Sequence, residues 1–409
     1  MDAVDLMNSD EADLPKTRMG EFGPYLENVF AGYLAMLCEV RPRTFLDNVV
    51  LKQLPRVTAL AAALLEVVEL CRNNKRHAAY DCLDAAIKPI AKHLSLLMPS
   101  GDMSLVLNPL YRLRNAGPKP YPRGGLFHIP FQSRRSVGET RYSVAGRPCL
   151  YLGGSTEVCW RELRRPNLSA VAVSRFHARP GTDLKVLNFG HRLPLLAAWV
   201  DKEPHKFLDF RSDAVKVVAH VTCWPLIAAC SIRVPDQARP ERPEYFVPQL
   251  MLEWIVRTRG FHGIRFFSTH YNEYPDDPKT YMNYVFPART TQAVGYCPDL
   301  CGLFDLTEPV TWEQAKAAPP AGMKRPRYKT REALDDAMEA EYGRAENWLL
   351  GLPHGPLDAI PDVMRVEFRD AVRDRAYAIW ESEHRTHGFD RDHWFRAKAE
   401  LNLPVHFVA

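Results

Sequence analysis

A glutamate at position 162 occupies a place where a helix would present an apolar side chain. Counting at the helical period puts Val158 and Cys159 on one arc, and Glu162 projects between them. A carboxylate on a buried face costs several kcal/mol of desolvation unless it is paired or takes part in chemistry. Glu162 is therefore a candidate catalytic carboxylate, and the structural alternative is an ion pair with Arg141 or Arg165.

The segment before this glutamate predicts the elements that hold it. Cys149–Leu152 is short, apolar and bounded by proline and glycine, which is typical of a strand. Gly153 and Gly154 permit a tight turn. Ser155 is a plausible helix N-cap, and Glu157 in the first turn suits the helix dipole. We therefore expect a strand, a turn and a helix that carries the glutamate.

Composition places the chain among ordinary globular proteins. Of its 409 residues, 46% are hydrophobic and 25% are charged, and the net charge is +4. That charge is too weak to predict nucleic acid as a partner, and no apolar run reaches the ~18 residues of a membrane span. The polar start shows no secretory signal. The nine scattered cysteines favour reduced thiols, so we expect a cytoplasmic protein that binds neither nucleic acid nor membrane.

No metal site is expected. Cys297 and Cys301 form a pair with three residues between them, but no second pair stands at zinc-finger spacing. His384, His387 and His393 lie close together in the tail, yet no cysteine or carboxylate completes a recognisable ligand pattern. Surface and capping roles are the preferred interpretation of these histidines.

Changes in pattern along the chain predict five regions. Residues 1–23 are polar and acidic and predict a disordered leader. Residues 24–100 show helical periodicity without strand signals, which predicts a helical domain. Residues 105–312 form the catalytic domain, residues 313–331 a linker rich in proline and basic residues, and residues 332–409 a helical C-terminal domain.

The central region alternates short β-rich runs with helices in an irregular order. Strand-like runs after Cys149–Leu152 are Ala170–Phe176, Leu184–Asn188, Leu226–Val234, Ile264–Phe267 and Tyr281–Phe286. A helix is predicted over Asp213–Cys223 and another from Pro248. No glycine-rich phosphate loop is present. This order predicts an α+β fold with a mixed β core rather than a doubly wound sheet.

Several segments together resemble the RES domain, a bacterial family named for its arginine, glutamate and serine. They are LYRLR at Leu110–Arg114, RYSVAGRPCLYLGGSTEVCWREL at Arg141–Leu163, YFVPQLMLEWI at Tyr245–Ile255, GIRFFS at Gly263–Ser268 and NYVFP at Asn283–Pro287. The central block is the most specific of these. The C-terminal tail separately resembles a small bacterial domain of unknown function.

The resemblance implies a fold similar to that of ADP-ribosyltransferase toxins and an enzyme that consumes NAD. RES proteins split the nicotinamide–ribose bond with water or inorganic phosphate as acceptor, so NAD is implied as substrate and a phosphorylase or glycohydrolase as the activity. Many are toxins neutralised by a separate protein, which implies an antitoxin or immunity protein as a partner. By position, the implied catalytic residues are Glu162, Arg141 and Ser268, and the implied substrate-binding residues are Arg112, Arg114, Tyr151 and Asn283.

The implied chemistry suits these residue types. Loss of nicotinamide leaves positive charge on the ribose, which the Glu162 carboxylate would stabilise. The diphosphate needs forked cations, which Arg141 and one of Arg112 and Arg114 would supply. Tyr151 would stack on a base or serve as a core aromatic. The Ser268 hydroxyl would bind a phosphate or an amide, or simply end a strand.

Two other functions compete with NAD degradation. A protein mono-ADP-ribosyltransferase would need an exposed loop to present its target, and the insertion Thr269–Thr280 could serve. A non-catalytic interaction protein would use the helical front and tail regions. The latter predicts no NAD turnover and no effect of Glu162→Gln.

Overall fold

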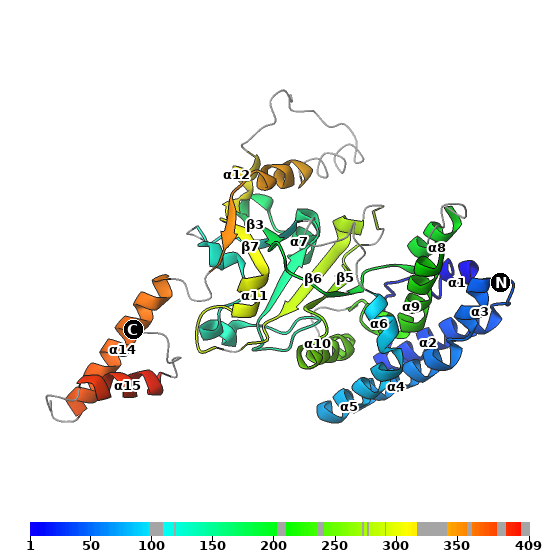
Figure 1. The fold of residues 1–409 in the computed structure, drawn as a ribbon, viewed down its shortest axis with the longest axis horizontal. Helices are drawn as coiled ribbons and strands as arrows, with labels where there is room; N and C mark the ends of the chain where they lie inside the picture. The colour runs from blue at the N-terminus through cyan, green and yellow to red at the C-terminus, as the bar shows by residue number, and fades with distance from the viewer. Residues whose placement is uncertain are drawn as a thin grey trace, which may run out of the picture.

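The computed structural model describes residues 1–97, 109–117, 120–202, 210–235, 241–271, 274–275, 278–290, 292–316, 342–357, 362–382 and 390–401. The expected α+β class is confirmed, because one mixed sheet stands at the centre with helices at both ends of the chain (Figure 1). None of the helices in these ranges combines the length and apolarity that a bilayer span requires.

The described strands form one sheet in the order β4-β5-β6-β2-β1-β3-β7-β9, with β8 paired to β3. Only β4 and β5 pair in parallel, and the other pairs are antiparallel. The strands are β1 (Leu110–Asn115), β2 (Cys149–Gly153), β3 (Val171–Ala178), β4 (Val186–Phe189), β5 (Gly263–Phe267), β6 (Met282–Pro287), β7 (Phe304–Thr307), β8 (Val310–Thr311) and β9 (His354–Pro356).

Helices precede, interrupt and follow the strands. The bounds are α1 (Ala3–Met7), α2 (Phe22–Glu39), α3 (Phe45–Leu51), α4 (Leu54–Arg72), α5 (Arg76–Ile87), α6 (Ala91–Leu96), α7 (Thr156–Glu162), α8 (Leu193–Lys202), α9 (Phe210–Ala229), α10 (Phe246–Thr258), α11 (Pro298–Leu303), α12 (Trp312–Lys316), α14 (Asp362–Ser382) and α15 (Asp390–Glu400). Residues 342–350 are also helical. The N-terminal helices gather on the side of the sheet where β5 lies (Figure 1).

The N-terminal helices share their core with α9, which comes from the middle of the chain. Helix α9 packs against α3, α4 and α6. The Tyr33 ring of α2 stacks on the Trp224 ring of α9, with centroids 3.9 Å apart, and the Tyr33 hydroxyl donates to the Val221 carbonyl. Trp254 of α10 donates to Asp84 of α5 at 3.0 Å. One continuous set of buried side chains therefore joins these helices to the sheet.

The expected disordered leader is wrong. A capping box begins helix α1, and Leu6 and Leu14 are buried. The Asp13 carboxylate accepts two hydrogen bonds from Arg192, and the Ala12 carbonyl accepts one from Trp224. The composition of residues 1–23 is polar, but apolar side chains and acidic groups in this segment contact residues far along the chain. These contacts hold the segment in one conformation.

A second expectation also fails, at the strand-like run Leu226–Val234. Its first part continues α9 to Ala229, with Pro225 inside the helix, and Leu226 is fully buried. The run is apolar because α9 is surrounded by other elements, and an all-round apolar helix carries no periodic signal. The other expected strands are confirmed to within two residues at each end. The expected helices over Asp213–Cys223 and from Pro248 lie within α9 and α10.

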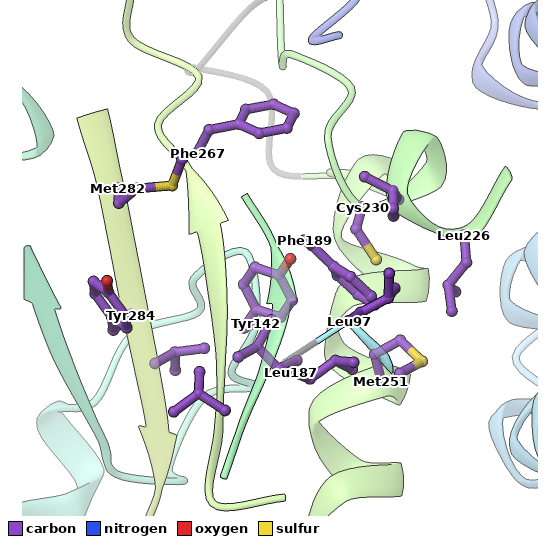
Figure 2. Close-up of a cluster of buried hydrophobic side chains, with 14 of the residues drawn as sticks. Leu97, Tyr142, Leu187, Phe189, Leu226, Cys230, Met251, Phe267, Met282 and Tyr284 are labelled. Carbon is purple, nitrogen blue, oxygen red and sulfur yellow. The ribbon is translucent and has the colours of Figure 1, made fainter. Parts of the chain in front are cut away.

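The core between sheet and helices forms on one face of β4. Leu187 and Phe189 turn toward Met251 of α10 and Leu226 of α9, whereas Tyr284 of β6 lies on the other side (Figure 2). The edge of β4 is also covered, because the Asn188 amide donates to the Leu97 carbonyl at 2.7 Å. This packing fixes the position of β5 and β6, which carry part of the site described below.

The C-terminal helices form a separate small cluster. Val372 and Ile379 of α14 pack with Ala397 of α15, apart from the main core. Before them, residues 342–357 return to the sheet, where β9 pairs with β7. Of the expected linker, residues 313–316 belong to α12, and the remainder lies outside the described residues.

Candidate active site

A cavity of about 410 Å³ opens beside β1, β2, β5 and β6, next to the end of α7. It joins segments that lie far apart in the sequence. Five of the seven predicted site residues line it: Arg112, Arg141, Tyr151, Glu162 and Asn283. Ser268 lies against the Glu162 carboxylate, whereas Arg114 points elsewhere. The volume lies within the range of about 300–1,000 Å³ that is usual for small-molecule sites.

Strand register brings one wall of the cavity together. Gly153 of β2 pairs with Asn283 of β6, which pairs in turn with Phe266 of β5. Residues paired in this way project to the same face of a sheet. Tyr151 lies two residues before Gly153 and so shares that face. All four residues line the cavity.

Gly153 lets α7 approach the sheet closely. A Cβ atom at this position would lie 2.5 Å from the Cys159 sulfur and 2.6 Å from Val158 Cγ1. The expected cap is present, since the Ser155 hydroxyl accepts from the Val158 amide. The turn and the cap together start α7 at the strand end, and seven residues later the helix ends at Glu162 beside the cavity.

Glu162 is held by two neutral donors. Its Oε1 atom accepts from Ser268 Oγ at 2.6 Å and from Asn283 Nδ2 at 2.7 Å. The expected burial of Glu162 is wrong, because its side chain is 36% exposed and faces the cavity. Val158 and Cys159 on the same face of α7 are buried, but Glu162 is the last residue of the helix, and its side chain extends beyond the core to line the cavity.

The structural alternative for Glu162 is not seen among the described contacts. Arg141 donates instead to the carbonyls of Ile232, at 2.9 Å, and Cys230, at 3.3 Å. Arg165 lies over the Trp160 ring. Glu162 therefore makes its closest contacts with Ser268 and Asn283 through Oε1, and its side chain lines the cavity.

His270 completes this group, and the sequence interpretation missed it. Its Nε2 atom lies 3.5 Å from Glu162 Oε2, and its backbone amide donates to Ser268 Oγ at 3.2 Å. The sequence feature that could have identified His270 as a site residue is its position two residues after Ser268, inside the Thr269–Thr280 insertion. Thr269 also lines the cavity, so the start of the insertion belongs to the site.

The structure distinguishes the two arginines of β1. Arg112 lines the cavity, and its buried Nη1 atom has no hydrogen-bond partner within the described ranges. Burial, with Arg114 nearby, lowers the pKa of the Arg112 guanidinium to about 10. Arg114 instead donates to the Gly125 carbonyl at 2.7 Å and lies over the Tyr121 ring. Arg112 is therefore the one of the two that can meet a ligand.

Aromatic and cationic side chains form the remaining wall. The Tyr151 hydroxyl lies 2.6 Å from Thr140 Oγ1, and burial raises the pKa of this phenol. Tyr245 has the guanidinium groups of Arg141 and Arg242 over its ring at 5.4 and 5.5 Å from the centroid. Arg242 and Tyr245 were not predicted as site residues. The cavity thus combines the carboxylates of Glu139 and Glu162 with cations and rings.

No group of three or more histidine, cysteine or acidic side chains that could hold a metal ion lies within the part of the chain that the structure describes. Cys297 and Cys301 are both buried. The groups that line the cavity are two carboxylates, an imidazole, a thiol, hydroxyls and guanidinium ions.

Comparison with known proteins gives two matches. A curated protein of Bacillus subtilis (strain 168), named "Putative toxin YopC", is 31% identical over 356 residues, which cover 83% of this chain and 79% of the relative. A family model described as protein of unknown function (DUF2934) matches residues 367–402, which confirms the expected resemblance of the tail. No solved structure matches the chain.

Proposed function

Because the chain belongs to the family of the Bacillus subtilis protein named "Putative toxin YopC", we propose that it is a toxin, and that it acts by cleaving the nicotinamide–ribose bond of NAD. The main observation in favour of this reaction is the position of the Glu162 carboxylate. Ser268 and Asn283 hold one of its oxygens, and the side chain lines a cavity of suitable size.

The proposed domain is a RES domain, and the quoted motifs support it by converging. Leu110–Arg114 supplies Arg112, the central block supplies Tyr151 and Glu162, and the segments at β5 and β6 supply Ser268 and Asn283. If the resemblance to the family were accidental, the matched residues would not be expected to lie around one cavity. Their meeting favours an enzyme over a non-catalytic interaction protein.

The chemistry proposed for Glu162 is electrostatic. As the bond between the ribose and nicotinamide breaks, its electron pair moves to the nicotinamide ring and positive charge develops on the sugar. A carboxylate that is already oriented stabilises this charge without reorganising in the transition state. Ser268 and Asn283 supply the orientation, because both donate to the same oxygen.

The cations and rings of the cavity suit the rest of NAD. Arg112 has a buried nitrogen without a partner in the described ranges, which a diphosphate oxygen would satisfy. Arg141 and Arg242 flank Tyr245 in the same cavity. The rings of Tyr151 and Phe266, which also line the cavity, would stack on the nicotinamide or the adenine.

The test is incubation of purified protein with NAD, followed by separation of the products, beside Glu162→Gln as the matched variant. Free nicotinamide with ADP-ribose supports a glycohydrolase, and nicotinamide with ADP-ribose 1-phosphate in phosphate buffer supports a phosphorylase. Labelled protein bands in a lysate would instead indicate a protein ADP-ribosyltransferase. Absence of any NAD turnover would refute the proposal.

The proposal includes a protein partner. A cell that makes an enzyme of this kind loses its own NAD unless the activity is restrained, so we expect a neutralising antitoxin or immunity protein. Expression of the wild-type chain alone should lower cellular NAD, and Glu162→Gln should not.

A further inference from the structure

His270 is the histidine of the cavity, and the proposed mechanism above gives it no task. Its side chain is 38% exposed, and its Nε2 atom lies 3.5 Å from Glu162 Oε2. The oxygen it faces is not the one that Ser268 and Asn283 bind, and both Glu162 and His270 line the cavity. An acceptor oxygen placed there can contact the imidazole and the carboxylate at once.

The position of His270 is fixed through its backbone. Ser268 Oγ accepts from the His270 amide at 3.2 Å and donates to Glu162 Oε1 at 2.6 Å. Between them, Thr269 Oγ1 accepts from Arg141 at 3.4 Å. One short turn therefore ties the imidazole, the carboxylate and an arginine of the cavity to each other.

Several other side chains of the cavity carry no acceptor lone pair or already take part in hydrogen bonds. Arginines carry no acceptor lone pair. Burial raises the pKa of the Cys159 thiol to about 12, and its sulfur donates to the Tyr111 carbonyl. The Tyr151 hydroxyl is engaged with Thr140, and Glu139 accepts from Gln249 at 2.8 Å. A neutral imidazole with hydrogen on Nδ1 has a lone pair on Nε2.

We propose that His270 is a catalytic residue that removes the proton from the acceptor water, an inference that rests on the proposed function. The bond from ribose C1′ to nicotinamide breaks, and its electron pair neutralises the nicotinamide ring. The water oxygen bonds to C1′, and its proton moves to His270 Nε2 and then to solvent. The Glu162 carboxylate stabilises the imidazolium that forms 3.5 Å away.

The test compares water with an acceptor that needs no base. His270→Gln should lower NAD hydrolysis by about 100-fold, the lower end of what general-base catalysis contributes. The azide anion carries no proton, so with added azide the variant should form the ribosyl azide at the wild-type rate. The KM for NAD should not change. His77→Gln is the control, since this histidine lies on α5 and is largely exposed.

The outcomes separate this inference from the proposed function. If the wild-type protein releases no nicotinamide from NAD, the proposed function fails and the inference fails with it. If the wild type is active and His270→Gln hydrolyses NAD equally well, only the inference fails. Equal loss with water and with azide would show that the histidine supports the structure of the site, and would also overturn the inference.

Discussion

Glu162→Gln removes the negative charge of the carboxylate and keeps the size and shape of the side chain. Glutamine has the same length, and its single oxygen can occupy the place of Oε1, where Ser268 and Asn283 both donate. No buried donor is then left without a partner, and the exposed position of the side chain limits any effect on stability. The change removes the negative charge that faces the cavity.

The expected loss follows from the distance at which that charge acts. A unit charge about 4 Å from the developing charge of the ribose contributes about 4 kcal/mol at an effective dielectric constant of about 20. Exposure of the side chain admits water and reduces this contribution, so we expect about 3 kcal/mol. Since each 1.36 kcal/mol corresponds to about tenfold in rate, kcat should fall by about 100-fold.

The assay is the initial rate of nicotinamide release at saturating NAD, with thermal unfolding of both proteins as the control for folding. Cellular NAD after expression gives a second measurement. If Glu162→Gln folds as the wild type does and keeps its kcat, the charge has no part in the reaction, and the electrostatic mechanism is refuted.

Three further substitutions test other parts of the site. Ser268→Ala should lower kcat by about 10- to 100-fold, because a hydrogen bond to a charged group is worth about 1.5–3 kcal/mol; unchanged kcat in the nicotinamide assay would contradict this. Arg112→Lys should raise the KM for NAD by about tenfold, whereas Arg114→Lys should leave it unchanged, and equal effects would count against the assignment. Gly153→Ala should lower the free energy of unfolding in urea by about 1–3 kcal/mol through overpacking. Gly260→Ala, where a Cβ meets nothing within 4 Å, is its control.

Local sequence determined the unit that carries the glutamate. The apolar run of β2, the two glycines and the Ser155 cap predicted a strand, a turn and a helix, and the structure confirms all three. These elements depend on hydrogen bonds between near neighbours and on side-chain period, which a short segment encodes by itself. The α+β class followed from the order of such segments.

Tertiary structure alone decided what surrounds Glu162. Ser268 and Asn283 lie 106 and 121 residues beyond it in the chain, and only the pairing of β5, β6 and β2 brings them within hydrogen-bond distance. The choice between Arg112 and Arg114 depends on their tertiary contacts, since Arg112 lines the cavity and Arg114 donates to the Gly125 carbonyl. The family motifs assign Ser268 and Asn283 to the site, but their contacts with Glu162 cannot be read from the sequence, because they depend on how the whole core packs.

The errors have the same origin. The leader has the composition of a disordered segment, yet Arg192 and Trp224 order it from more than a hundred residues away. The run after Cys223 is apolar enough for a strand, yet it continues a helix that other helices enclose. The periodicity of apolar residues in the sequence indicates which face of a helix or strand is buried. The tertiary fold determines which element packs against that face.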